Sequence, residues 1–149
     1  MTELIVNLRV MKKAQDEVRS VIGDRRTMLE DDLQRLSYLK ALIKEIFWLH
    51  LPAPVLVLRE SMEEVTITGY QIPTKTRFFI NAWAIGRDPM SWENPEIFNP
   101  DRFIGNPIDL KGQDFELIPF GVGRRGYPTI TFGAASIELS LAQLLHYFD

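Results

Sequence analysis

The 149-residue sequence contains no cysteine. This absence excludes disulfide bonds, thiolate catalysis, cysteine-bound zinc and cysteine-bound iron–sulfur clusters within the chain. Histidine is scarce as well: His50 and His146 are the only two, and neither has a partner at the spacing of metal ligands. We therefore expect each histidine to lie at a helix end or on the surface, and not to bind a metal.

The sequence also lacks a strong charge of one sign and a long apolar run. Its formal net charge is −3, so no basic field for nucleic acid is expected. No apolar run is long enough to span a bilayer, and residues 1–13 indicate an amphipathic helix and not a signal peptide. The remaining composition, 46% hydrophobic and 25% charged, is that of an ordinary globular protein with one domain over residues 1–149. A cytoplasmic location is the default expectation.

Apolar residues at helical spacing predict helices in both the first and the last part of the chain. The first predicted helix ends at Gly23, and its apolar face consists of Leu4, Leu8, Met11, Val18 and Ile22. A short helix is expected over residues 31–36. Ser37 is the expected N-cap of the next helix, which ends before Pro52 and whose buried stripe consists of Leu39, Leu42, Ile43, Ile46 and Phe47. The last helix is predicted over residues 131–148.

The middle of the chain indicates short strands followed by an irregular segment. An apolar strand is expected over residues 55–59, and a hairpin with its turn at Thr68-Gly69 joins VTI to YQI. A further strand over residues 76–81 precedes a short helix that begins at Ala82. Residues 91–107 are proline-rich but carry Trp92 and Phe103, which predicts a packed meander. The fold class is therefore α+β: helices, a small mixed sheet, a meander, a loop and a final helix.

A glycine-rich stretch, PFGVGRRGYPTITFG, precedes the last helix. Gly121, Gly123 and Gly126 spell G-x-G-x-x-G, the pattern of dinucleotide-binding loops. That motif requires a strand before it, a helix directly after it and an acidic residue at a later strand end. Here Tyr127-Pro128 interrupts the entry to the helix, and the next acid, Glu138, falls inside the helix. A nucleotide site is therefore not predicted, and the loop is expected to surround and closely approach a different group.

The segment PFGVGRRGYP resembles the haem-binding loop of the cytochrome P450 family, the haem-thiolate monooxygenases. The signature of that loop is F-x-x-G-x-R-x-C-x-G, and Phe120, Gly123 and Arg125 match it. Tyr127 stands at the position of the cysteine ligand, and Thr129 stands at the final glycine.

Other segments resemble the same family in the same order. KEIFWLH is similar to the E-x-x-R helix, with Glu45 in place and Trp48 where the arginine belongs, and PEIFNPDRF is similar to the meander motif with Arg102. Three further segments also match: VLVLRES, GYQIPTKT and AIGRDP. The sequence of these motifs is most similar to the plant-type microsomal branch of the family. The resemblance covers nearly the whole chain. It implies the C-terminal half of the cytochrome P450 fold, without the distal helix, the membrane anchor and most substrate-recognition segments.

The resemblance implies roles for several residues. Arg59, Phe120, Gly121, Gly123 and Arg125 occupy haem-contact positions, where the two arginines hold propionates in relatives; the alternative is that both are solvated arginines. Glu45 and Arg102 are expected to form a structural ion pair, left short of partners because Trp48 offers only a neutral indole N–H. Tyr127 occupies the metal-ligand position, and no residue is expected to be catalytic.

The family activity is haem-dependent monooxygenation of small lipophilic substrates, driven by an NADPH-dependent reductase. A cysteine thiolate pushes electron density onto the iron, and a phenol gives up its proton less readily than a thiol. We therefore expect this truncated chain to be inactive. Two alternatives stay open: haem bound through Tyr127, and a regulatory fragment that associates with a full-length relative or a reductase through exposed apolar helix faces. Intact relatives lie on the endoplasmic reticulum membrane.

Overall fold

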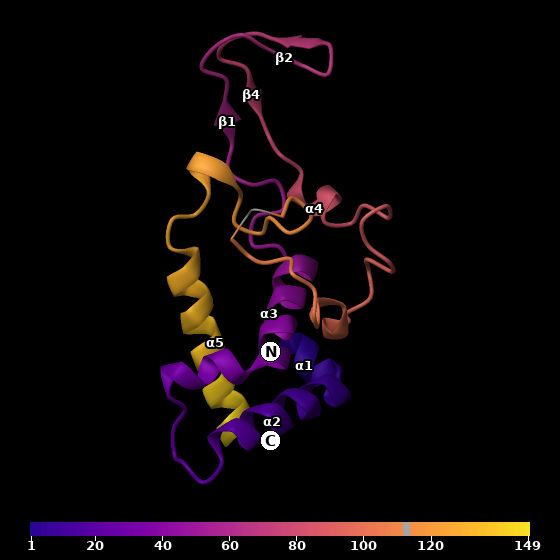
Figure 1. The fold of residues 1–149 in the computed structure, drawn as a ribbon. Coiled ribbons are helices and arrows are strands. Elements are labelled where there is room, and N and C mark those ends of the chain that lie inside the picture. Colours follow the sequence, from indigo (N-terminus) through magenta and orange to yellow (C-terminus); the bar gives the residue numbers. More distant parts are fainter. Residues whose placement is uncertain (112–113) are drawn as a thin grey trace.

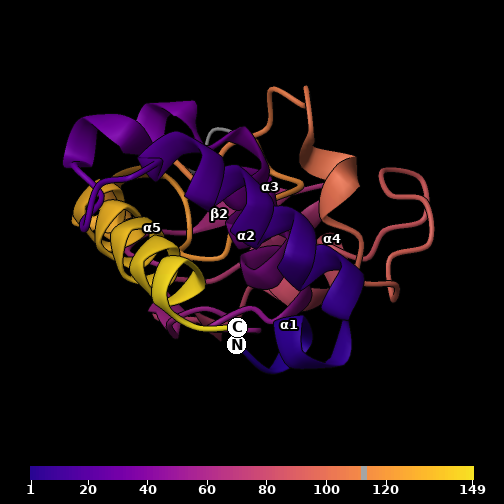
Figure 2. The same cartoon turned by 90° about the horizontal axis from the view of Figure 1, so that it is seen from below.

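The computed structural model describes residues 1–111 and 114–149, with the side chain of Arg125 outside the described part. Three helices, α2 (Leu8–Ile22), α3 (Ser37–Leu49) and α5 (Ile130–Tyr147), form one end of the molecule. A β arm, residues 55–80, extends from the other end of α3 (Figure 1). Seen from below, α2 passes in front of α3 and lies beside α5 (Figure 2). The predicted α+β class is confirmed.

The first predicted helix is two helices, α1 (Thr2–Val6) and α2, separated at Asn7. Asn7 has φ −111° and ψ 68°, and its side-chain amide donates a hydrogen bond to the Glu3 carbonyl oxygen at 2.9 Å. This local bond competes with the helical path, which is a common behaviour of asparagine. The prediction of one continuous helix was therefore wrong at Asn7, whereas α2 does end before Gly23, which has φ +59°.

The start of α3 is held by a residue of α2 and not by Ser37, so the N-cap prediction was wrong. Ser37 is itself the first helical residue. Glu17 accepts hydrogen bonds from the backbone N–H of Tyr38 at 2.8 Å and of Leu39 at 2.9 Å. A carboxylate at a helix N-terminus satisfies free amides and interacts favourably with the helix dipole. Glu17 therefore joins α2 to α3 just after the 3₁₀ helix η1 (Glu30–Arg35), where the short helix was expected.

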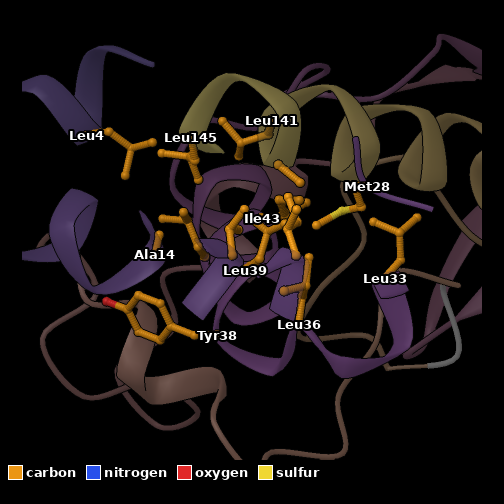
Figure 3. Packing of buried hydrophobic residues seen from close by; sticks show 14 residues of the cluster. Leu4, Ala14, Met28, Leu33, Leu36, Tyr38, Leu39, Ile43, Leu141 and Leu145 are labelled. Atoms are coloured by element: carbon orange, nitrogen blue, oxygen red, sulfur yellow. The ribbon is translucent and has the colours of Figure 1, made fainter. Parts of the chain in front are cut away.

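The main hydrophobic core lies between α2, α3 and α5, with contributions from α1 and η1 (Figure 3). Of the predicted α3 stripe, Leu39, Leu42 and Ile43 are fully buried, while Ile46 and Phe47 pack at the edge. The other buried members of the core are Leu4, Ala14, Val18, Ile22, Met28, Leu33, Leu36, Tyr38, Leu141, Ala142 and Leu145. The helical periodicity of the sequence therefore located most of this core, but Leu8 of the predicted first face is 64% exposed and Met11 is only partly buried, because the break at Asn7 separates Leu4 from the following turns.

The β arm consists of two separate antiparallel pairs and not of one mixed sheet. Strand β1 (Arg59–Glu60) pairs with β4 (Arg77–Phe78), and β2 (Val65–Ile67) pairs with β3 (Tyr70–Ile72). The predicted hairpin is confirmed: Ile67 lies opposite Tyr70, and both turn residues have positive φ, as tight hairpin turns require. Of the strand expected over residues 55–59, only Arg59 lies in a strand, β1, and Val57 is 77% exposed.

The meander is irregular but packed, as predicted. It follows the single-turn helix α4 (Ala82–Ile85), whose first turn is capped by the Asn81 side chain. It contains one 3₁₀ helix, η2 (Pro100–Phe103), and both Trp92 and Phe103 are buried. Helix η2 packs directly on α3. This contact places the meander beside α3, the helix on which Phe120 of the glycine-rich loop also packs.

Candidate functional site

Glu45 lies on α3 and is completely buried. One carboxylate oxygen accepts a hydrogen bond from Arg102 Nε at 3.0 Å, and the other accepts one from the Asn99 backbone N–H at 2.6 Å. Burial raises the pKa of Glu45, while the Asn99 amide and the Arg102 charge oppose that rise. The predicted ion pair between Glu45 and Arg102 is therefore present, and the backbone of the meander supplies a partner that sequence reasoning missed.

Arg102 is bound on its remaining edges by backbone carbonyls of the meander. Its Nη1 donates to Glu93 O at 2.7 Å, and its Nη2 donates to Ile97 O at 2.7 Å and to Asn94 O at 3.2 Å. The guanidinium carbon lies 4.6 Å from the centroid of the Trp48 ring. Carbonyls and an aromatic face thus surround this cation. The expected shortage of partners concerned the Glu45 carboxylate, and both of its oxygens have a hydrogen-bond donor, Arg102 Nε and the Asn99 amide.

The glycine-rich loop is closed by its own backbone. Gly121 and Gly123 have φ +75° and +72°, a conformation that favours glycine, and the 3₁₀ helix η3 (Gly123–Arg125) follows. The Tyr127 backbone N–H donates to the Phe120 carbonyl oxygen at 3.1 Å. A Cβ on Gly126 would lie 3.2 Å from the Gly123 carbonyl oxygen, so the loop is tight at that point as well.

Aromatic rings flank the loop. The Phe120 ring meets Phe47 of α3 edge to face with centroids 4.9 Å apart, and its other neighbour is Tyr127 at 6.1 Å. Tyr127 is 57% exposed. The loop is thus anchored to α3 through Phe120, while the side chain at the predicted ligand position is open to solvent.

Arg59 of β1 lies against this loop. Its Nη2 would be 3.8 Å from a Cβ on Gly121. Its Nε is buried and has no hydrogen-bond partner among the described residues. A buried donor without an acceptor is costly, so an additional anionic or acceptor group could bind here and accept a hydrogen bond from Arg59 Nε. The structure therefore brings together Arg59, Gly121, Phe120 and Tyr127, while the side chain of Arg125 lies outside the described part.

Residues 1–111 and 114–149 contain neither a metal-binding cluster of side chains nor a helix suited to span a membrane. No cluster of three or more His, Asp or Glu side chains there could hold a metal ion. No helix in that part is both long enough and apolar enough to cross a bilayer.

The family model for cytochrome P450 matches residues 1–149, the whole chain. The chain belongs to the cytochrome P450 family. It is 70% identical to "Cytochrome P450 71AP13" of Prunus mume and 60% identical to "Cytochrome P450 71A1" of Persea americana, in each case over the whole chain. The alignments cover 29% and 30% of those relatives, so the chain spans about 30% of their length.

A solved cytochrome P450 from zebrafish has the same fold. It superposes with a TM-score of 0.83 at 29% sequence identity, over 96% of this chain and 32% of that one. Membership of the cytochrome P450 family implies haem as the family cofactor. The unpartnered Nε of Arg59 fits an anionic group such as a propionate. The axial donor does not fit a haem thiolate, because the ligand position holds a phenol and the chain contains no cysteine.

Proposed function

We propose that residues 1–149 are one partial cytochrome P450 domain that carries the haem loop but does not perform thiolate-dependent monooxygenation. The observation that carries this proposal is Tyr127 at the ligand position, with its backbone fixed by Phe120 and its ring exposed. The phenol oxygen lies further from the backbone than a thiol sulfur does, and it cannot supply the electron donation of a thiolate. The family reaction, with a small lipophilic substrate and an NADPH-dependent reductase, would require that donation.

The other predicted residues fit contact roles toward haem. Arg59, and Arg125 with it, would pair with propionates, because guanidinium forks match carboxylates. Gly121 and Gly123 would let the backbone approach the porphyrin closely, and Phe120 would place an apolar ring beside it. Glu45 and Arg102 would have a structural role only, because both are engaged with the meander.

The test is a haem titration followed by absorption spectra of the ferrous–CO form. It is made on the wild type, Tyr127→Cys and Tyr127→Phe. We expect only Tyr127→Cys to give the red-shifted band of a thiolate–CO complex, because only that variant has a sulfur ligand. The proposal fails if the wild type gives that band. It also fails if the wild type, with haem and reductase, turns over a substrate above a haem-only control.

A second candidate function is haem binding through Tyr127 without oxygenation. The exposure of the ring beside Phe120 favours it, as does Arg59 Nε, which lies in the same loop region and has no hydrogen-bond partner among the described residues. Tyrosinate does ligate haem in catalase, so the donor type is chemically adequate. A Soret band that is present in the wild type and absent in Tyr127→Phe would support this candidate. Equal spectra for these two proteins would exclude it.

A third candidate is a binding fragment that associates with a full-length relative. It is favoured by an apolar groove between α3 and α5, lined mainly by Ile43, Ile46, Phe47, Ile137, Leu141 and Leu144. Ile137 and Leu144 are each 41% exposed, so apolar surface is available there. Co-purification with a full-length relative that is lost in Ile137→Asp but kept in Ile67→Asp, a matched change in the β arm, would support it. Equal recovery with both variants would contradict it.

A further inference from the structure

Two consecutive aromatic residues of α3 contact two different neighbours. Phe47 meets Phe120 of the glycine-rich loop, whereas Trp48 points into a second buried cluster on the meander side. Trp48 is 1% exposed, and its ring lies 4.9 Å from Trp92 and 6.4 Å from Phe103. In the family signature this position carries an arginine, so the chain has exchanged a cation for the largest aromatic side chain.

The exchange leaves Arg102 well bound, because its edges and its face have different partners. The N–H groups of Arg102 donate to Glu45 and to meander carbonyls, while the guanidinium carbon lies over the Trp48 ring, 4.6 Å from its centroid. Edge hydrogen bonds and face stacking are compatible for a planar guanidinium. Trp48 therefore interacts with the same cation that Glu45 holds, without adding a charge to the buried site.

The Trp48 cluster also reaches the glycine-rich loop. Leu117 is 1% exposed and belongs to the same buried cluster, and it precedes Phe120 by three residues. A Cβ on Gly86 would lie 3.4 Å from Trp48 Nε1, so the chain after α4 also passes close to the indole. Trp48 thus lies against the meander and close to the chain after α4, in the same buried cluster as Leu117 at the base of the loop.

We propose that Trp48 is the positioning residue that fixes both the meander and the base of the glycine-rich loop to α3, by stacking on Arg102 and packing on Trp92, Phe103 and Leu117. In this chain it takes the place of the second cation of the family signature. The proposal rests on the proposed function only in treating the glycine-rich loop as the haem loop. Its test needs no haem, so a chain that fails to bind haem leaves this test unaffected.

The experiment is amide hydrogen exchange of the 149-residue chain, read separately for residues 92–103 and for residues 117–127. The variants are Trp48→Leu, which removes the aromatic face, and Trp48→Phe, which keeps a face for Arg102. Trp83→Leu is the matched control, because Trp83 also lies under an arginine, Arg87 at 4.3 Å, but is 44% exposed and outside the cluster.

For Trp48→Leu we expect exchange to become faster in both segments by on the order of a hundredfold, as for a large core truncation. Trp48→Phe should restore protection to within about tenfold of the wild type, because the cation–π contact is retained. Trp83→Leu should change neither segment.

Three results would overturn the proposal: equal exchange in the wild type and Trp48→Leu, an effect confined to the meander, or no difference between Phe and Leu at position 48. If Trp48→Leu loses its helical circular dichroism, a double-mutant cycle decides, made of the wild type, Trp48→Phe, Arg102→Gln and the double variant, because Arg102→Gln alone also breaks the bonds to Glu45 and the carbonyls. Stacking on Arg102 requires the effect of Trp48→Phe to be smaller in the Arg102→Gln background than in the wild type. Equal effects of Trp48→Phe in both backgrounds would overturn the proposal.

Discussion

The meander and the glycine-rich loop both pack on α3, but the arginines Arg102 and Arg59 beside them have different numbers of partners. On the meander side, Arg102 has a carboxylate, three carbonyls and an aromatic face as partners, and the pair with Glu45 is almost fully buried. On the loop side, Arg59 Nε has no partner among the described residues, and Tyr127 is exposed. Buried indole Nε1 atoms on the meander side, of Trp48 and Trp92, also lack a hydrogen-bond partner among the described residues. The groups that hold the fold are thus separate from the groups suited to a ligand, so changes on the two sides should have different consequences.

The largest expected effect is that of Arg102→Ala, which removes the centre of the meander contacts. It leaves Glu45 buried without its cation and three carbonyls without a donor. Breaking a buried ion pair from one side costs about 3–5 kcal/mol of the free energy of unfolding. Urea unfolding followed by circular dichroism measures this loss.

Arg77→Ala is the matched control for that prediction. Arg77 pairs with Glu60 at 3.5 Å in the β arm, and the two side chains are 74% and 51% exposed. Exposed pairs contribute about 0–1 kcal/mol, so this variant should unfold nearly like the wild type. Similar losses in Arg102→Ala and Arg77→Ala would remove the distinction between a satisfied meander and the rest of the surface.

A smaller effect is expected from the pH dependence of Glu45. Its pKa is raised in the folded chain above the ordinary value of 4.5, mainly by burial. The folded state therefore binds a proton more readily than the unfolded state, and this contribution to stability falls as the pH rises from 4.5 through the raised folded pKa.

The difference between the wild type and Glu45→Gln isolates that contribution. Asp32, whose pKa is lowered by Arg25, and Glu138, whose pKa is raised by burial, titrate in both proteins and cancel. We expect the free energy of unfolding of the wild type to fall relative to that of Glu45→Gln across this window. A difference that is constant with pH, or that rises, would show that Arg102 and Asn99 compensate the buried carboxylate fully.

The helices and the hairpin could be predicted because their signals are local. Thr68-Gly69 determines the register of β2 and β3 by turn geometry alone, and the apolar spacing of α5 determines its length. The cap of α3 could not be predicted, because Glu17 lies 21 residues before Tyr38 and meets it only after α2 has folded back. The strand expected over residues 55–59 forms only at Arg59 for a similar reason: its apolar residues have no partner strand among the described residues.

The site was predictable in part. The resemblance identified Glu45, Arg102, Arg59 and the loop, but only packing shows the Asn99 amide on Glu45 and Trp48 on Arg102. A single apolar stripe on α3 was predicted, whereas α3 is buried on more than one side because the meander covers Glu45 and Trp48. Contacts between distant segments carry no local sequence signal, and these contacts account for the rest of the site.

On the loop side, Gly121→Ala should have a moderate cost. A Cβ at Gly121 would make only ordinary contacts, at 3.8 Å from Arg59 and from Leu56, so the cost comes from φ +75°. A left-handed conformation costs a residue with a Cβ about 1–2 kcal/mol. Gly133→Ala, inside α5 with open space around it, should instead stabilise the chain by about 0.5–1 kcal/mol. Urea unfolding of both variants checks the opposite signs, and a gain from Gly121→Ala would show that the loop relaxes out of the described conformation.

The smallest effect is expected from Tyr127→Phe. Because the Tyr127 ring is 57% exposed, removing its hydroxyl leaves no buried polar group unpaired, and the change should be within about 0.5 kcal/mol in urea unfolding. Tyr70→Phe in the β arm, where Tyr70 is 76% exposed, is the matched control and should behave alike. A loss above about 1 kcal/mol for Tyr127 alone would mean that its hydroxyl supports the loop and that the two sides of α3 are not separable. A neutral result means that any spectral difference between the wild type and Tyr127→Phe after haem addition reports ligand chemistry and not a change in folding.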